Sequence, residues 1–428
     1  MRIVRLASPQ TRDADPEHYA TGQDIDARTN HAVTSRIPVL VTDGEQRAGL
    51  AVVRSLGRAG YAPIVVSRDA RSLGGVSRYA AASVQVPDAL RHSDEFLRSV
   101  AEIVRRYEAR VVVPVTEPSC FALLDAGAAL HGAVVAGPTL AAFRAISDKE
   151  HMLAVAREVG LATPAQLRLG RAADLDDALL AALPFPVVLK PTRSVRSGAI
   201  HSVAYASDAH ALRARVAALP ESAFPLLVQQ RVIGEGSGVF LLRWNQQVLA
   251  TFAHRRLRES PPSGGASVYS ESVAADPQLV AAATRLLERF EFQGVAMLEL
   301  KRDTATGTPY VMEVNGRLWG SLQLAIDAGV DFPALLVNAA LGRPPRQPPQ
   351  YRAGVRLRWW WGDVNHVLAR LRHSADRLAL PPNAPTRGRL VRDFLAWRRA
   401  DRNETLRADD IRPFFVDTLQ WLKARIGN

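Results

Sequence analysis

Two short apolar segments, separated by a turn-rich break, constrain this chain more than any other feature. Val295 to Leu300 and Tyr310 to Val314 read as strands, and the break between them, Asp303 to Pro309, contains Thr, Gly and Pro. This pattern predicts a β-hairpin. In antiparallel pairing, Glu299 falls roughly opposite Glu313.

The second strand of this hairpin brings polar groups together. Glu313 and Asn315 share one face, because side chains on a strand alternate with a period of two. With Glu299 they supply two carboxylates and an amide oxygen, and Arg317 follows just beyond. Mg²⁺ takes oxygen ligands, usually one or two carboxylates plus substrate phosphates. The sequence therefore predicts a site for Mg²⁺, or for Mn²⁺ in its place, at Glu299, Glu313 and Asn315. The alternative is a surface hairpin whose acids pair with nearby arginines.

Lysine is rare in this chain. Of 54 basic residues only four are lysine, at positions 149, 190, 301 and 423. Lys149 lies in the helix-like segment that begins at Ser147, and Lys190 ends the apolar run that begins at Phe185. A compact, flexible ammonium suits phosphate oxygens. We interpret Lys149 and Lys190 as phosphate contacts, with chance survival of lysine as the alternative.

Five motifs in a fixed order make the chain resemble the ATP-grasp superfamily from about Val39 to Gly342. They are IPVLVTDGEQRAGLAVVRSLGRAGYAPIVVS, SDKEHMLAVAREVGLATP, FPVVLKP, LLVQQRVIGEGSGVFLL and the set Glu299, Glu313, Asn315 and Arg317. The resemblance implies an α/β fold class: a Rossmann-like domain, then a two-lobed α+β ATP-grasp domain. A small helical C-terminal extension would follow. The expected segments are a tail at 1–35, the first domain at 36–145, the ATP-grasp domain at 146–343 and a Trp- and Arg-rich extension at 344–428.

The resemblance also implies roles for the nucleotide-binding residues. ATP would lie between the two lobes, with Lys149 and Lys190 on its α- and β-phosphates. Gln229 and Gln230 stand where many relatives have glutamate, and glutamine can also bond the adenine edge. Val232 would offer backbone groups to adenine, and Glu235 would reach the ribose. An ordinary strand and turn is the alternative for this hinge.

The loop after Lys190, PTRSVRSGAIHSV, departs from the glycine-rich lid of the family. The loop contains Arg193 and Arg196, and it has few glycines. Either the arginines supply charge in place of backbone amides, or the loop is less closely applied to ATP.

The run from Ala250 to Val273 is unusually basic. On a strand, His254, Arg256 and Arg258 would share one face. The segment resembles the basic stretch that family members place against phosphates or a carboxylate substrate. Arg317, with Arg256 or Arg258, would then hold the transferred phosphoryl group or the acceptor. A solvated basic hairpin is the alternative, and His254 alone reads as structural.

The first third of the chain alternates strand-like and helix-like segments. Val39 to Thr42, Ile64 to Val66 and Arg110 to Val115 predict strands of a parallel, doubly wound sheet. Ligands of such sheets lie beyond the carboxyl ends of the strands. Thr42 to Glu45 and Thr116 to Pro118 are therefore candidate walls of the second substrate's site, with ordinary turns as the alternative. The segment TDGEQRAG is not GxGxxG, so no dinucleotide is predicted.

Composition narrows the remaining classes. The single cysteine, Cys120, excludes an internal disulfide framework and a four-cysteine zinc site. The net charge of +12 favours polyanions, but no nucleic-acid-binding motif is present and the arginines are spread along the chain. No stretch of about twenty apolar residues is free of charge, and the N-terminus lacks a secretory core. We expect a cytoplasmic enzyme that acts on small molecules, without a specific nucleic acid or a transmembrane segment, and a homodimer as in many relatives.

The function that the resemblance implies is ligation. An ATP-grasp ligase phosphorylates a carboxylate to an acylphosphate, and an amine or a similar nucleophile then displaces phosphate; ADP and phosphate are released. Carbamoyl-phosphate synthase large subunits contain two such halves, and this chain has one. The alternatives are a kinase-like enzyme that stops at a phosphorylated product and a non-catalytic nucleotide-binding scaffold.

Overall fold

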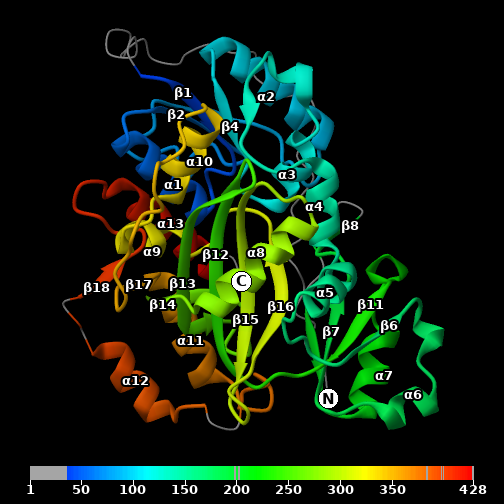
Figure 1. The fold of residues 1–428 in the computed structure, drawn as a ribbon. Coiled ribbons are helices and arrows are strands. Elements are labelled where there is room, and N and C mark those ends of the chain that lie inside the picture. The colour runs from blue at the N-terminus through cyan, green and yellow to red at the C-terminus, as the bar shows by residue number, and fades with distance from the viewer. Residues whose placement is uncertain are drawn as a thin grey trace. The chain divides into compact units, whose positions relative to one another are not determined.

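The computed structural model describes residues 36–196, 199–200, 203–381, 384–396, 398 and 400–426. The predicted tail, 1–35, lies outside the described residues, and so do residues 197–198 and 201–202 of the predicted lid loop. Within the described residues, Figure 1 shows a mixed α/β fold, as predicted.

The first part of the described chain is a five-stranded parallel sheet with the order β3-β2-β1-β4-β5. Its strands are β1 (Pro38–Val41), β2 (Ala62–Ser67), β3 (Ala82–Gln85), β4 (Val111–Val113) and β5 (Val134–Val135). Its helices are α1 (Arg47–Arg58), α2 (Ser93–Tyr107), α3 (Glu117–Leu123), η1 (Gly127–Leu130) and α4 (Leu140–Ser147). One face of the sheet packs on α1 and the other on α2, each through its own apolar core. The predicted doubly wound sheet is confirmed.

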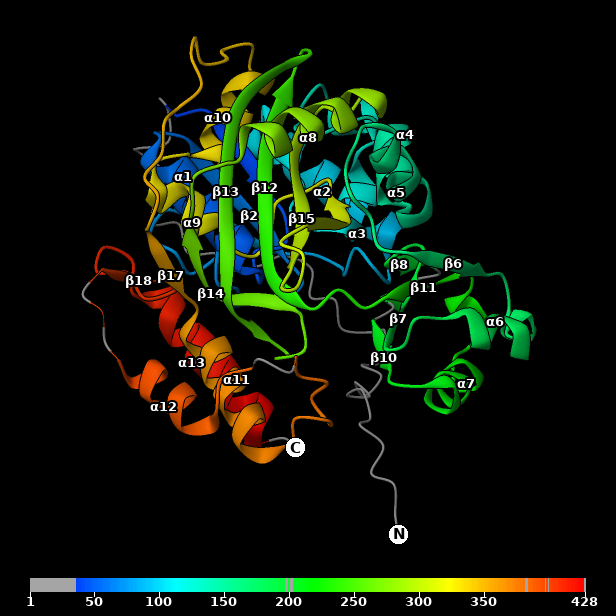
Figure 2. The ribbon, with the colours of Figure 1, turned by 60° about the horizontal axis from the view of Figure 1, so that its bottom comes forward.

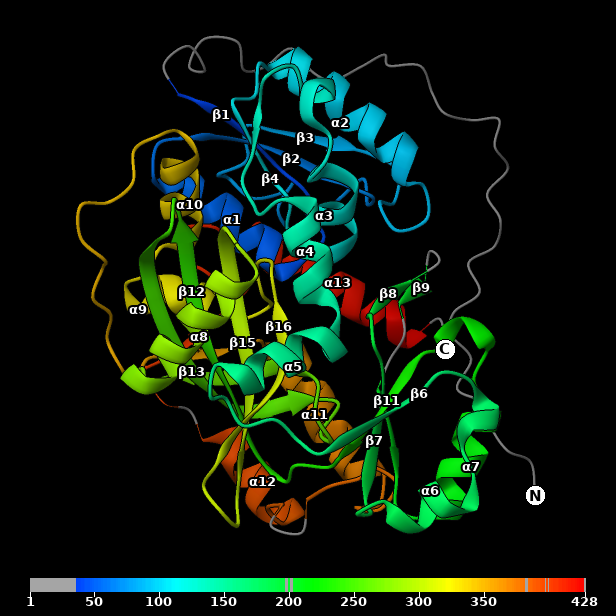
Figure 3. The ribbon, with the colours of Figure 1, turned by 45° about the vertical axis from the view of Figure 1, so that its right-hand side comes forward.

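A smaller antiparallel sheet follows, with the order β10-β7-β11-β6. Its strands are β6 (Gln166–Leu169), β7 (Val187–Pro191), β10 (Ala204–Ala206) and β11 (Leu226–Gln230). Around it lie α5 (Lys149–Glu158), η2 (Ala172–Asp174), α6 (Asp177–Ala182), α7 (Ala209–Ala217), η3 (Glu221–Ala223) and the two-stranded ribbon of β8 (Val195–Arg196) and β9 (Ala199–Ile200). Figure 3 shows α6 and α7 against this sheet, where an apolar core covers one face only. The opposite face, which carries Lys190, stays available.

A seven-stranded sheet with the order β16-β15-β12-β13-β14-β17-β18 forms the second lobe. Its strands are β12 (Gly234–Trp244), β13 (Gln247–Ser260), β14 (Ala266–Ser272), β15 (Gly294–Asp303), β16 (Pro309–Asn315), β17 (Arg356–Arg358) and β18 (Asp401–Asn403). The predicted hairpin is confirmed as β15 and β16. Helix α8 (Pro277–Arg289) packs on one face, and α9 (Leu322–Ala328) and α10 (Phe332–Ala340) belong to the core on the other.

The chain after residue 343 does more than add helices, because β17 and β18 extend the large sheet. Helices α11 (Trp360–Arg372), α12 (Arg387–Leu395) and α13 (Arg412–Ile426) come from the same region. In Figure 2, α11 runs beside α12 and α13, in orange to red. Trp361 stacks on Trp421 with ring centroids 4.3 Å apart. The tryptophans therefore pack within the protein.

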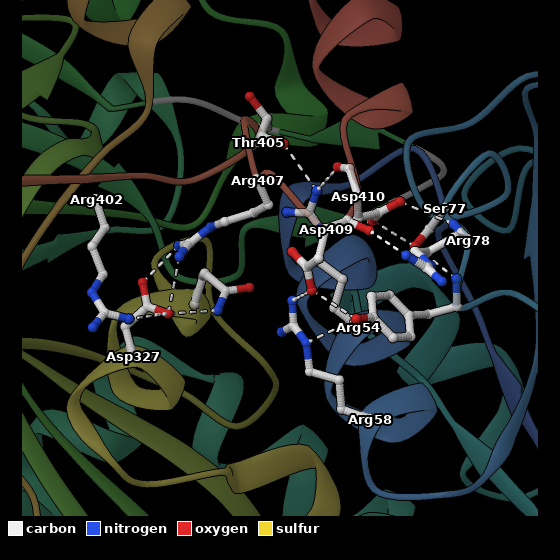
Figure 4. A network of polar contacts seen from close by, with 12 residues as sticks. Arg54, Arg58, Ser77, Arg78, Asp327, Arg402, Thr405, Arg407, Asp409 and Asp410 are labelled. Atoms are coloured by element: carbon white, nitrogen blue, oxygen red, sulfur yellow. Dashed lines mark hydrogen bonds and ion pairs between the residues drawn. The ribbon is translucent and has the colours of Figure 1, made fainter.

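A buried polar network joins the first sheet domain to the C-terminal residues (Figure 4). The guanidinium of Arg54 on α1 donates to the Asp410 carboxylate at 2.8 Å and to the Glu404 and Thr405 carbonyls at 2.9 Å each. Arg54 and Asp410 are 1 % and 3 % exposed. Asp410 also accepts from the Ser77 hydroxyl at 2.7 Å. Because an unpaired buried charge is very costly, these contacts fix residues 404–410 against α1.

Among the described helices, none taken singly has the length and apolarity to cross a membrane. Helices α9 and α10 reach that length and composition only as a pair, with a bend of 93° between them. Gly329, whose φ of 124° is the left-handed conformation that glycine tolerates, ends α9.

Candidate active site

The hairpin places its polar residues as predicted. In the register of β15 and β16, Glu299 lies directly opposite Glu313, and Met297 lies opposite Asn315. The Asn315 amide donates to the Glu313 carboxylate at 3.2 Å, and the Arg317 guanidinium donates to the Asn315 amide oxygen at 3.2 Å. Three side chains of the predicted set therefore form one chain of hydrogen bonds, and Glu299 lies across from it on β15.

A cavity of about 370 Å³ opens over this hairpin, and we call it the central cavity. Its polar lining includes Lys190, Arg256, Glu299, Glu313, Asn315 and Arg317. These residues come from the small sheet, from β13 and from the hairpin. Six of the twelve predicted site residues thus line one cavity between the two sheets.

Lys149 reaches the same carboxylates from α5. Asp148 caps this helix, since its carboxylate accepts from the His151 amide at 3.2 Å. The Lys149 ammonium lies 3.4 Å from the Glu313 carboxylate and donates to the Ser194 hydroxyl at 2.7 Å. The first helical turn and the loop after Lys190 are therefore joined at this lysine.

The two lysines decide the charge of Glu313. Burial raises the pKa of this carboxyl, but the ammonium groups of Lys149 and Lys190 outweigh burial and lower the pKa from 4.5 to about 2. Burial lowers the pKa of Lys190, and Glu313 and Glu299 oppose that effect. Glu313 is therefore ionised near neutral pH, as a metal ligand must be.

Arg256 holds the other carboxylate of the hairpin. Its guanidinium donates to both Glu299 oxygens, at 3.1 and 2.7 Å, to Glu259 at 2.8 Å and to the Gly265 carbonyl at 3.2 Å. Burial lowers its pKa, but Glu299 and Glu259 raise the pKa by more. Arg256 is therefore a fixed cation beside the predicted metal ligands, and it also ties the Gly264–Gly265 loop to them.

The two predicted walls from the first sheet meet at Asp43. Its carboxylate accepts from the Thr116 amide at 3.1 Å and from the Thr116 hydroxyl at 2.9 Å. Thr116 ends the turn after β4, and Glu117 follows it beside Lys149, Glu313 and Arg317 in a small hollow next to the central cavity. Burial raises the pKa of Glu117, against the lowering effect of Arg317 and Lys149. The carboxyl ends of β1 and β4 thus face the hairpin.

Arg258 does not belong to this cluster, and its predicted role needs correction. The β13–β14 ladder shifts register between Arg256 and Arg258, so the two side chains no longer alternate in step. The Arg258 guanidinium instead pairs with the Asp363 carboxylate of α11, at 2.5 and 2.6 Å, and lies over the Tyr269 ring. His254 is buried in the large sheet, with its ring 4.8 Å from that of Phe240.

Glu235 lies on the wrong face of β12 for the predicted ribose contact. It is opposite Arg302 in the β12–β15 register, whereas Gly236 is opposite Lys301, which lines the central cavity. A Cβ on Gly236 would lie 2.9 Å from the Glu259 carboxylate and 3.0 Å from Arg256. Alternation along the strand therefore turns Glu235 away, toward Arg255 at 3.9 Å.

The remaining hinge residues divide between two faces. Gln229 and Lys190 lie on the same face of the small sheet, because Gln229 is opposite Val188, two residues before Lys190. The Gln229 amide is buried and donates to Gln166 at 2.7 Å. Gln230 is exposed, and Val232 is 7 % exposed at the crossing into β12. Gln229 therefore lies on the face that carries Lys190, and its amide is engaged by Gln166.

In the loop after Lys190, the Arg193 guanidinium donates to Asp148 at 3.3 Å at the surface. Arg193 is therefore paired with a carboxylate and does not line the central cavity. The side chain of Arg196 lies outside the described residues.

The donor chemistry fits the predicted metal. Glu299, Glu313 and Asn315 offer hard oxygen atoms within one cavity, which Mg²⁺ prefers. The described residues contain no group of three or more His, Cys, Asp and Glu side chains placed to bind a metal ion. Two carboxylates and an amide would therefore need phosphate oxygens and water to complete the coordination, which is the usual arrangement for nucleotide-bound Mg²⁺.

Sequence reasoning missed three residues that line the central cavity: Arg47, Lys301 and Trp319. The rarity of lysine singled out Lys301 in the sequence. Whether its side chain faces the cavity depends on which face of β15 carries it, and this could not be read from the sequence. Arg47 directly follows the wall at Thr42 to Glu45, so the rule for carboxyl ends of parallel strands could have found it.

Comparisons with known proteins agree with this geometry. Residues 222–362 match the family model described as ATP-grasp in the biosynthetic pathway with Ter operon. A search of curated proteins finds no match.

Solved structures share the fold over most of the chain. The L-amino acid ligase of Bacillus licheniformis has a TM-score of 0.56 at 18 % identity, over 74 % of this chain and 75 % of its own. N5-carboxyaminoimidazole synthetase of Staphylococcus aureus, complexed with ADP, has a TM-score of 0.57 at 13 % identity, over 74 % and 80 %. A biotin carboxylase ATP complex from Campylobacter jejuni has 0.58 at 17 %, over 72 % of each chain. The chain therefore has the fold of these ATP-grasp structures, and residues 222–362 are similar to an ATP-grasp family model.

Proposed function

We propose that this protein is an ATP-dependent carboxylate–amine ligase that works through an acylphosphate and releases ADP and phosphate. The observation that carries the proposal is the central cavity, where Glu299 and Glu313 oppose each other between Lys190 and Arg256. The similar structures include an amino acid ligase and ADP- or ATP-bound enzymes, which supports a nucleotide in this cavity.

The nucleotide would lie between the small and large sheets. Lys149 and Lys190 would neutralise its phosphates, and Gln229 would adjoin the adenine face. Mg²⁺ on Glu299, Glu313 and Asn315 would supply charge neutralisation of the phosphates when bound. Arg256 and Arg317 would hold the transferred phosphoryl group or the acceptor, because fixed guanidiniums stabilise developing negative charge.

The reaction has two balanced steps. A carboxylate oxygen of the acceptor forms a bond to the γ-phosphorus, and the bond from that phosphorus to the ADP oxygen breaks. The amine nitrogen then forms a bond to the acyl carbon, inorganic phosphate leaves from that carbon, and the amine proton passes to solvent. These steps require positioning and charge neutralisation more than side-chain acid–base chemistry.

The test is ADP and phosphate release by the purified protein with Mg-ATP and a broad library of carboxylic acids and amines. Release that requires both an acid and an amine is the expected result. Release with one acceptor alone would establish a kinase-like enzyme instead. Absence of ATP binding would refute a nucleotide in the central cavity.

A further inference from the structure

Arg47 occupies a place that the nucleotide chemistry does not use. It is the first residue of α1, beyond the carboxyl end of β1, and it lines the central cavity beside Gly320 and Ser321. Its side chain is 12 % exposed. A Cβ on Gly320 would lie 3.2 Å from the Arg47 Nη2 atom, so the guanidinium closely approaches the backbone there. Arg47 is thus a cation that the first domain contributes to the cavity.

The C-terminal residues hold this guanidinium. Arg47 Nη1 donates to the carboxylate of Glu404, which is 3 % exposed. The guanidinium carbon also lies 4.1 Å from the centre of the Trp359 ring, within cation–π distance. Glu404 follows β18, and its amide donates to the Arg358 carbonyl of β17 at 2.9 Å. Two strands of the large sheet therefore position a side chain of the first domain.

Residues 404–410 also contact α1 two turns after Arg47, at Arg54. Arg47 and Arg54 are seven residues apart and so lie on one face of the helix. Arg54 binds the Thr405 carbonyl and the Asp410 carboxylate (Figure 4). It also binds the Glu404 carbonyl. The backbone of Glu404 is held by Arg54 while its carboxylate holds Arg47. Such support from surrounding residues is what keeps a binding side chain in one orientation.

We propose that Arg47 binds a second anionic group of the acceptor acid, and that Glu404 and Trp359 are its positioning residues. This inference rests on the proposed ligase function. It assigns the substrate class as acids with an anionic group, a carboxylate or a phosphate, besides the carboxylate that reacts. A guanidinium is the side chain best matched to both groups, through paired hydrogen bonds.

The position of Arg47 separates it from the nucleotide's cations. Lys149 and Lys190 belong to α5 and β7, and Arg256 is bound to the carboxylates of the hairpin. Arg47 comes from the first domain and lines the same cavity as Trp319. Arg47 and Arg317 thus offer the acceptor two cations in one cavity.

The experiment measures ADP release by the full chain with Mg-ATP, a pool of amines and pairs of acids that differ by one anionic group. The pairs are aspartate and asparagine, glutamate and glutamine, and phosphoserine and serine. We expect the member with the extra carboxylate or phosphate to be the better substrate. The pair with the largest difference in activity shows whether that group is a carboxylate or a phosphate. Arg47→Gln should raise the KM for that acid about 10- to 100-fold, with little change in kcat or in the KM for ATP.

Two further variants test the positioning. Glu404→Gln should raise the same KM by a smaller factor, and Arg47→Lys should restore part of the affinity that Arg47→Gln loses. Arg58→Gln is the matched control, because Arg58 also binds the C-terminal segment from α1, at Asp409 2.7 Å away, but does not line the cavity. It should leave the KM for the acid unchanged.

Equal activity with both members of every pair, or an unchanged KM in Arg47→Gln, would overturn the inference and leave the ligase proposal standing. Activity with other acids of the broad library, but with none of the dianionic ones, would do the same. No ADP release with any acid would overturn both.

Discussion

Two groups of ion pairs involve the large sheet, and they differ in access. In the central cavity, Arg256 binds Glu299, whose side chain is 21 % exposed, and Lys149 binds Glu313, whose side chain is 29 % exposed. Next to α11, Arg258 and Arg358 share Asp363, whose side chain is fully buried. Both groups join basic side chains to carboxylates, and β13 supplies an arginine to each.

The difference indicates which pairs can exchange partners. A carboxylate that opens on a cavity can leave its arginine for a metal ion or bind both, whereas Asp363 is enclosed by its two guanidiniums. Buried pairs contribute little net stability, but removing one partner leaves an uncompensated charge. The first group is therefore suited to chemistry and the second to joining α11 and β17 to the sheet.

The largest expected effect is a loss of activity when a carboxylate of the central cavity is removed. Glu313→Ala should lower the turnover of ATP by about 10³-fold, because it removes a predicted metal ligand and the counter-charge of two lysines. The protein should still fold, with a melting temperature lowered by the loss of the ion pair with Lys149. ADP release and thermal unfolding measure the two effects, and a fully active variant would refute the metal assignment.

The matching substitution in the buried group should act on stability. Asp363→Asn leaves Arg258 and Arg358 without a counter-charge, so the free energy of unfolding should fall by about 3 kcal/mol. Denaturant unfolding measures this loss. Activity per folded molecule should remain near that of the unchanged protein; a specific loss of activity in the folded fraction would place Arg258 in the catalytic set after all.

Lys149→Met tests the pairing of Glu313 through the pH dependence of the melting temperature. The pKa of Glu313 is held at about 2, below its ordinary value of 4.5, with Lys149 the larger of the two cationic influences. A carboxyl whose pKa is lowered by folding stabilises the protein above the ordinary pKa, and this contribution is lost as pH falls through the folded pKa. The melting temperature of Lys149→Met should therefore lie below that of the unchanged protein above pH 4.5, and the gap should close toward pH 2. A gap that does not depend on pH would contradict the assigned pairing.

The smallest expected effect tests which face of β12 carries Glu235. Glu235→Ala should change the KM for ATP by less than about twofold, because Glu235 points away from the central cavity and surface ion pairs contribute little. Gly236→Ala is the informative partner, since its Cβ would crowd Glu259 and Arg256. A large rise in the KM for ATP in Glu235→Ala would restore the ribose contact that the register argues against.

The sequence predicted the parts of the site that depend on local pattern. The hairpin, its register at Glu299 and Glu313, and the strand that carries Lys190 all follow from short-range periodicity and turn residues. The walls at Thr42 to Glu45 and Thr116 to Pro118 followed from a rule about parallel sheets, and Asp43 joins them.

The parts that the sequence did not predict depend on pairing between distant segments. Arg258 was misplaced because the register shift after Arg256 exists only in the ladder with β14. Glu235 was misplaced because its face is set by pairing with β15, more than sixty residues later. Strands β17 and β18 are three residues each, too short to show a period, so only the expected helices of this region were visible in the sequence.

The contact between Arg47 and Glu404 spans 357 residues of chain. During synthesis from the N-terminus, the hairpin of β15 and β16 is complete long before Glu404 leaves the ribosome. A nascent or truncated chain would therefore have this hairpin without the oriented Arg47. On the proposed function, such a chain would admit ATP to a site that has no anchored acceptor. Coupled use of ATP would then depend on synthesis of residues 404–410.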